Sequence, residues 1–164
     1  MKIMKKTVKF LSAIMVAAGL LTSLSLQSCS DDNNDEPAAP AAKSVAGSYT
    51  GDLGMTVMGS TDTTEDVTFS LTATDDTHAT LTFPTYGNPP MQIQEFDIPG
   101  LAVTKDGETY KIARTDYEQT LANGRTASGA VEGDVVDGVL TLRFTLQYGA
   151  MPMEMVGNFS GSKN

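Results

Sequence analysis

The sequence predicts an all-β fold, an antiparallel meander of about eight strands closed into a small barrel. From Val45 onward, apolar residues alternate with Thr, Ser and Asp at a period of two, and no segment carries an apolar stripe of period 3.6. Turn residues separate the alternating segments at the spacing of hairpins. A barrel removes the exposed edges of an open sheet, and a two-sheet sandwich is the alternative. The chain has 164 residues, which suits one such domain.

The first element along the chain is a predicted signal peptide, residues 1–28. Four lysines lie within the first nine residues, and the apolar run 10–26 that follows contains no acidic residue. A membrane-spanning helix needs about 20 consecutive apolar residues, and this run is shorter and interrupted by small polar ones. We therefore expect the segment to be cleaved rather than retained.

The only cysteine, Cys29, is the predicted lipidation site. The preceding residues 26–28, Leu-Gln-Ser, together with Cys29 resemble the lipobox of bacterial lipoproteins. The resemblance implies diacylglycerol on the thiol, cleavage before Cys29 and acylation of the new amine. The alternative is a cysteine that follows an ordinary signal peptide by chance. A lipidated Cys29 leaves no disulfide within the chain, and its acyl chains anchor the protein at about 0.8 kcal/mol per buried CH₂.

Residues 29–44 are the predicted tether. The acidic run 30–36 resembles the surface-export signal of lipoproteins from a Gram-negative phylum of host-associated anaerobes, which implies exposure on the outer face of the outer membrane. The alternative is a solvated spacer that keeps the domain away from anionic headgroups. Residues 37–42, rich in Pro and Ala, predict an extended linker, and the domain is expected to cover residues 45–163.

The first three predicted strands alternate regularly. The turn at Asp75-Asp76 separates the second strand from the third. The apolar residues expected on one face are Tyr49, Gly51, Leu53, Met55, Val57, then Val67, Phe69, Leu71, Ala73, then Ala79, Leu81 and Phe83.

The middle of the domain is less regular. Ile93 and Phe96 have opposite parity, which predicts a bulge or break near Glu95. The pair Asp106-Gly107 predicts a hairpin turn. A second turn, Asn123-Gly124, is expected between two short strands, one around Tyr117 and the other around Ala130-Val131.

The last two predicted strands are clearer. The first alternates from Leu140 to Tyr148, and the second runs from Met151 through Met153 and Met155 to Phe159. The first and last strands are both long and well patterned, so we expect them to pair and close the barrel.

Three motifs resemble the calycin-like (lipocalin-like) β-barrel domain of lipoproteins from Gram-negative host-associated anaerobes. They are residues 45–51, Val-Ala-Gly-Ser-Tyr-Thr-Gly; Gly133 with residues 139–142; and residues 151–161, from Met-Pro-Met to Asn-Phe-Ser-Gly. The resemblance covers about residues 45–163 and implies an eight-stranded barrel without a known activity. Lipocalins begin their first strand with Gly-x-Trp, and this chain has Tyr49 in place of the tryptophan.

The net charge excludes nucleic acid as a partner. The signal peptide holds four of the 11 basic residues and none of the 20 acids, so the mature chain has a formal charge of −13. Binding of phosphate backbones requires a basic surface, which this composition does not supply. Repulsion from anionic lipid also leaves the anchor at Cys29 as the expected membrane contact.

No catalytic, metal or cofactor site is predicted, and we expect a protein that is not an enzyme. His78 is the only histidine, and no cluster of Cys, His and Glu has the spacing of metal ligands. No Gly-x-Ser-x-Gly motif accompanies His78, which argues against a serine hydrolase. A glycosidase carboxylate pair is disfavoured because most acids lie in predicted turns or in the tether.

The methionines have two interpretations. The one that we favour is that methionine fills gaps in a closed core. The other is a ligand site, since an eight-stranded barrel is wide enough for one small molecule and thioethers adapt to varied apolar ligands. The predicted ligand-binding residues are Tyr49, Met55, Phe69, Phe83, Met91, Phe144, Met153 and Met155.

Two surface features complete the prediction. Residues 86–90 form a rigid turn, and Tyr86, Asn88, Pro89 and Pro90 are its expected partner contacts. Thr63 follows an aspartate and resembles an O-glycosylation acceptor of exported proteins. The sequence therefore predicts a surface-anchored protein that binds a small apolar ligand or a partner at the barrel mouth. The alternative is an inhibitor or accessory envelope protein that acts through its loops around a packed barrel.

Overall fold

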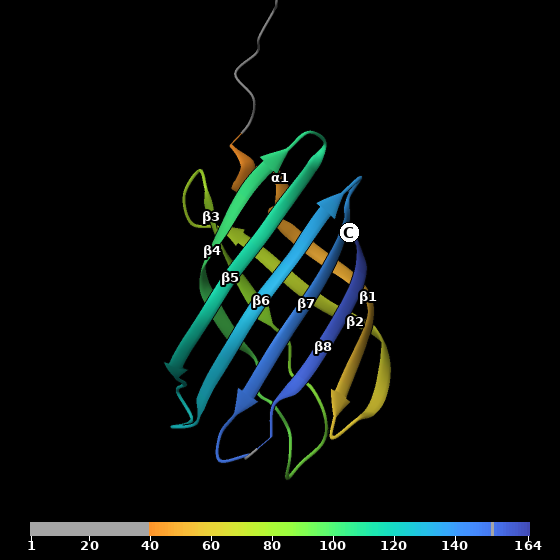
Figure 1. Ribbon diagram of the computed structural model, residues 1–164, viewed down its shortest axis with the longest axis vertical. Coiled ribbons are helices and arrows are strands. Elements are labelled where there is room, and N and C mark those ends of the chain that lie inside the picture. The colour runs from red at the N-terminus through yellow and green to blue at the C-terminus, as the bar shows by residue number, and fades with distance from the viewer. Residues whose placement is uncertain (1–39, 152) are drawn as a thin grey trace, which may run out of the picture. The chain divides into compact units, whose positions relative to one another are not determined.

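The computed structural model describes residues 40–151 and 153–164 as a closed antiparallel barrel with one short helix (Figure 1). Each strand pairs with the next, and β8 pairs with β1 to close the sheet. The predicted all-β barrel of about eight strands is confirmed, and the sandwich is excluded. The elements are α1 (Ala41–Val45), β1 (Gly47–Val57), β2 (Ser60–Ala73), β3 (His78–Phe83), β4 (Phe96–Asp106), β5 (Thr109–Thr120), β6 (Thr126–Val136), β7 (Val139–Tyr148) and β8 (Met155–Lys163).

Helix α1 lies at one end of the barrel and corrects one prediction. The extended linker was expected through Ala42, but Ala41 and Ala42 are helical. Alanine is the strongest helix former, and Pro40 precedes the first turn, where its missing N–H is not needed. Ala42 and Val45 are fully buried, so the helix packs on the barrel as part of its core. The signal peptide and Cys29 lie outside the described residues.

The first hairpin has the predicted faces but is longer than expected. Tyr49 and Phe69 pair directly and both are buried. The turn between β1 and β2 is Met58-Gly59, and both residues have positive φ, 53° and 81°. Hairpin turns of this kind usually contain Asn or Gly at the first position, so a turn at Met58 could not be predicted from its residue type.

The remaining differences from the predicted strands, like the predicted break, lie at irregular positions of the sheet. The predicted break near Glu95 is confirmed, because residues 84–95 connect β3 to β4 with a single bridge between Tyr86 and Ile93. The short strand expected around Tyr117 belongs to the longer β5, whose pairing with β6 shifts between Arg114 and Tyr117. The last strand begins at Met155, so the expected start at Met151 is wrong.

Candidate functional site

The barrel interior gathers most of the predicted ligand-binding residues. Tyr49, Met55, Phe69, Phe83, Phe144 and Met155 are all buried there. The prediction is wrong for Met91, whose side chain is 64% exposed. Met153 is half-buried and precedes β8. Both methionines lie in connections, where the alternation of a strand does not apply.

Aromatic rings fill this interior. The ring of Phe69 lies 5.4 Å from that of Phe83 and 4.7 Å from that of Phe159, measured between centroids. Phe144 packs edge-on against Phe83 at 5.4 Å. A Cβ atom added at Gly157 would overlap the ring of Phe144, so glycine is needed there to make room. Rings from β2, β3, β7 and β8 therefore pack against one another across the interior of the barrel.

Tyr49, which stands where lipocalins have tryptophan, joins the barrel wall to α1. Its hydroxyl donates a hydrogen bond of 2.6 Å to the carbonyl oxygen of Val45. Burial raises the pKa of the phenol above its ordinary value. Tyr49 therefore holds α1 over the end of the core, and the barrel is covered there.

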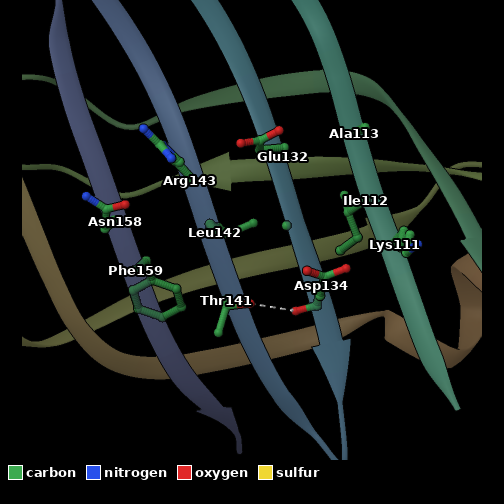
Figure 2. Close-up of a pocket in the computed structure, with 11 residues that line it drawn as sticks. Lys111, Ile112, Ala113, Glu132, Asp134, Thr141, Leu142, Arg143, Asn158 and Phe159 are labelled. Carbon is green, nitrogen blue, oxygen red and sulfur yellow. Dashed lines mark hydrogen bonds between the residues drawn. The ribbon is translucent and has the colours of Figure 1, made fainter.

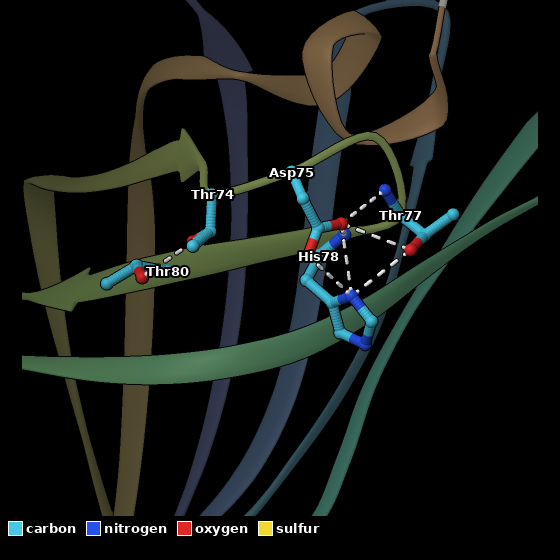
Figure 3. Close-up of polar contacts among 5 residues, drawn as sticks. All are labelled: Thr74, Asp75, Thr77, His78 and Thr80. Carbon is cyan, nitrogen blue, oxygen red and sulfur yellow. Dashed lines mark hydrogen bonds and ion pairs between the residues drawn. The ribbon is translucent and has the colours of Figure 1, made fainter.

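The turn between β2 and β3 lies beside α1, and the only histidine, His78, follows this turn as the first residue of β3 (Figure 3). The Asp75 carboxylate accepts hydrogen bonds from the backbone N–H groups of Thr77 and His78, at 2.7 and 2.8 Å. The Thr77 amide, with smaller contributions from the His78 and Thr77 side chains, lowers the pKa of Asp75 to about 2. The imidazole Nδ1 of His78 lies 3.0 Å from the same carboxylate. These contacts build the turn, and no serine nucleophile takes part in them.

We call the opposite end of the barrel the loop end. It comprises the turn 58–59 and the connections 84–95, 121–125, 149–151 and 153–154 (Figure 1). The predicted partner loop lies here. Tyr86 is half-buried and exchanges two backbone hydrogen bonds of 2.9 Å with Ile93. Asn88, Pro89 and Pro90 are exposed, and the peptide bond between the prolines is cis.

Tyr148, at the end of β7, ties these connections together. Its ring is fully buried, and its hydroxyl accepts hydrogen bonds from the Gln94 amide at 3.2 Å and the Asn123 side chain at 3.1 Å. The guanidinium of Arg125 lies 5.5 Å from the centre of the Tyr148 ring, within the range of a cation–π contact. Sequence reasoning missed both Arg125 and Tyr148, because only the fold brings them together.

A hollow of about 700 Å³ lies at the loop end beside Tyr148. It contains apolar side chains and a single charged residue, Arg125. None of the three ion pairs among residues 40–151 and 153–164 involves Arg125. The lining residues are Pro90, Met91, Gly124, Arg125, Thr126, Tyr148, Gly149, Ala150 and Met151.

A second hollow, of about 640 Å³, lies on the sheet β5 to β8 (Figure 2). Its charges have both signs, with Glu132 opposite Arg143 and Lys111 opposite Asp134 in the strand pairing. The Thr141 hydroxyl donates a hydrogen bond of 3.4 Å to the Asp134 carbonyl oxygen. This balanced arrangement favours neither an anion nor a cation as ligand. The hollow at the loop end, whose one charged lining residue is Arg125, favours an anion.

Thr63 is exposed on β2, directly opposite Gly54 of β1. The position is accessible, and its glycosylation stays a prediction. In the part of the chain that the structure describes, no three His, Cys, Asp or Glu residues gather into a group that could hold a metal. Within the same residues, no helix has the length and apolar character needed to span a membrane.

Comparisons with known proteins agree with this architecture. The family described as the calycin-like beta-barrel domain matches residues 45–162. No curated protein matches the sequence. A crystal structure from Bacteroides fragilis NCTC 9343, named a "putative outer membrane protein", is similar with a TM-score of 0.67 and 24% identity. The match covers 76% of this chain and 53% of the other, so this chain spans about half the length of that protein. At this identity the likeness shows the fold alone.

Proposed function

This chain belongs to the calycin-like β-barrel domain family, and from that premise we propose that it is a lipid-anchored, non-enzymatic envelope protein that binds a partner at its loop end. The barrel is its scaffold. One observation carries the proposal, namely that the barrel interior is packed while apolar side chains are exposed at the loop end. Met58 and Met91 are 82% and 64% exposed, whereas Phe69 and Phe83 are buried. Exposed apolar groups in loops held by a rigid scaffold are typical of binding surfaces.

The proposed location is the outer membrane, with the anchor at Cys29. The lipobox supports lipidation, and the acidic run 30–36 supports export to the surface. Residues 29–40 connect the anchor to α1, and an extended chain of that length reaches about 40 Å. Residue 40 leads directly into α1, so the chain enters the barrel at the end opposite the loop end.

A pull-down from envelope extracts with the lipidated full-length protein tests this function. In one variant, residues 86–90 are replaced by a Gly-Ser segment of the same length. The control variant carries Lys105→Ser near the end of β4 and Glu108→Ser in the turn that follows, both exposed and away from the loop end. We expect the loop variant to lose its specific partner and the control to retain it, with both showing the circular dichroism of the wild type. Equal recovery by both variants would reject the loop end as the binding surface.

A displacement assay with an apolar fluorescent probe tests the packed interior. The probe should show no saturable binding to the wild-type protein, because the rings of Phe69, Phe83 and Phe144 occupy the interior. Saturable binding that an aliphatic competitor displaces, with the loop variant unaffected, would instead support a ligand inside the barrel.

A further inference from the structure

The loop-end hollow has the composition of a protein interface. Methionine and arginine are enriched where proteins bind each other, and arginine often contributes much of the binding energy. The hollow brings together Arg125, Met91 and Met151 beside the fully buried Tyr148. The inference that follows rests on the proposed function, since it describes the partner of the same surface.

The charge of this hollow differs from that of the chain as a whole. The mature chain has a formal charge of −13, yet the lining of the hollow includes one guanidinium and no carboxylate. Among the described residues, no acid lies within 4.0 Å of Arg125 to neutralise it. An anionic group that approaches this hollow therefore meets a cation, although the net charge of the chain is negative.

The backbone of Arg125 is held in its turn by hydrogen bonds, and its guanidinium lies over the Tyr148 ring. Its amide donates to the Asn123 side-chain oxygen at 2.9 Å, and its carbonyl oxygen accepts from the Leu121 amide at 2.8 Å. The Tyr148 ring lies under the guanidinium and is fixed by two hydrogen bonds to its hydroxyl. A prepositioned guanidinium loses less entropy when it forms a hydrogen-bonded ion pair.

The exposure of the hollow favours a protein segment over a small molecule. Small-molecule sites bury most of the surface of their ligand. Here Pro90 and Arg125 are exposed, and Met91 is 64% exposed, so the hollow is open to solvent. A segment of another protein can cover such a surface from outside, and flexible thioethers adapt to the side chains that it presents.

We propose that the loop-end hollow binds a protein segment that presents a carboxylate flanked by apolar side chains. The carboxylate pairs with Arg125, and the apolar side chains pack on Met91, Met151 and Pro90. Such a pair is charge-assisted and can be bidentate, so the arginine would select a carboxylate over a neutral amide of the same shape.

Three short peptides test the proposal against the lipidated protein in nanodiscs. Each is capped at both ends and has one central residue between leucines, which is Glu in the first, Gln in the second and Lys in the third. We expect the Glu peptide to bind about fivefold or more tightly than the Gln peptide, because only the former makes a charge-assisted bond. The Arg125→Glu variant should reverse the preference toward the Lys peptide, and Arg125→Gln should abolish the preference between Glu and Gln. Arg143→Glu, an exposed change on the outer face of β7, should leave the Glu preference intact.

Equal binding of the Glu and Gln peptides to the wild-type protein would overturn the proposal. So would an unchanged order of affinities in Arg125→Glu, or no binding of any peptide at millimolar concentration. Thermal unfolding of each variant shows that it is folded, and the milder Arg125→Gln keeps the test valid if the charge reversal destabilises the turn. Failure here with loss of the partner in the pull-down would reject the carboxylate but keep the loop end as the binding surface. Failure of both would reject the proposed function as well.

Discussion

At the α1 end of the barrel, polar side chains of the turns bond to one another, whereas the two most exposed large apolar side chains of the described residues lie at the loop end. Val136 and Val139, which flank a turn at the α1 end, are only 40% and 38% exposed. The Asp75 carboxylate is bonded within its own turn, and Lys43 of α1 forms an ion pair of 3.2 Å with the neighbouring Asp76. At the other end, Met58 and Met91 extend into solvent. The contacts at the α1 end therefore serve the fold, and the exposed apolar groups at the loop end are the basis of the binding surface that we propose there.

Phe69→Ala should have the largest effect, because Phe69 contacts three other rings of the core. We expect a loss of about 3–5 kcal/mol in the free energy of unfolding, measured by urea denaturation. The new cavity should also admit an apolar fluorescent probe that the wild-type protein does not bind. A loss below about 1 kcal/mol with probe binding already present in the wild type would mean that the interior is open, and the contrast between the two ends would lose its basis.

Tyr49→Phe should weaken the α1 end alone. The change removes the hydrogen bond to Val45 and leaves a buried carbonyl without its partner, which costs about 1–3 kcal/mol. Hydrogen exchange should become faster at the amides of Ala42 and Ala46, which bond to Asp76 and Ala42. Exchange at the Ile93 amide, in the loop end, is the internal control. Faster exchange at both ends would show that they are not independent.

Tyr148→Phe should weaken the loop end by a smaller amount. The Gln94 amide and the Asn123 side chain lose their shared acceptor, but both residues are exposed and water can replace it. We expect a loss of about 0.5–1.5 kcal/mol in the free energy of unfolding and faster hydrogen exchange at the amides of Gln94 and Gly124. Unchanged exchange there, or a change at Ala42, would contradict the role assigned to this hydroxyl.

Acidification should lower the stability of the fold by the smallest amount, and it should act at the α1 end. The folded pKa of Asp75 is about 2, below its ordinary value of 3.8. Its stabilising contribution is therefore complete above about pH 4 and is lost as the pH falls toward about 2. The Lys111 ammonium also lowers the pKa of Asp106, which adds a decline of the same sign. Thermal midpoints of the wild type and Asp75→Asn between about pH 5 and pH 2 should converge on acidification, and parallel curves would rule out this linkage.

The barrel could be predicted from the sequence, because the alternation of apolar and polar residues indicates which side of a strand is buried. It placed Tyr49, Phe69 and Phe83 in the core, and all three are buried. It failed where an extra residue in one strand changes the parity. The pairing of β5 with β6 shifts between Arg114 and Tyr117, so one strand looked like two.

The candidate site was less predictable. The loop 86–90 was expected from its prolines, which restrict the backbone, but Met91 was assigned to the interior by a parity that a loop does not obey. Arg125 and Tyr148 are separated by a hairpin and meet only through tertiary packing. The burial of α1 likewise depends on a contact between Ala42 and the distant Asp76. Local sequence patterns do not predict any of these long-range contacts.

Hydrogen exchange of the native lipidated protein, measured alone and with the envelope fraction that it captures, shows which surface the partner covers. We expect protection in the connections 86–94, 121–125 and 149–151, with the α1 end and the outer face of β5 to β8 unchanged. Protection confined to residues 111–113, 132–134 and 141–143 would contradict this expectation, because the partner would then occupy the hollow on the sheet rather than the loop end.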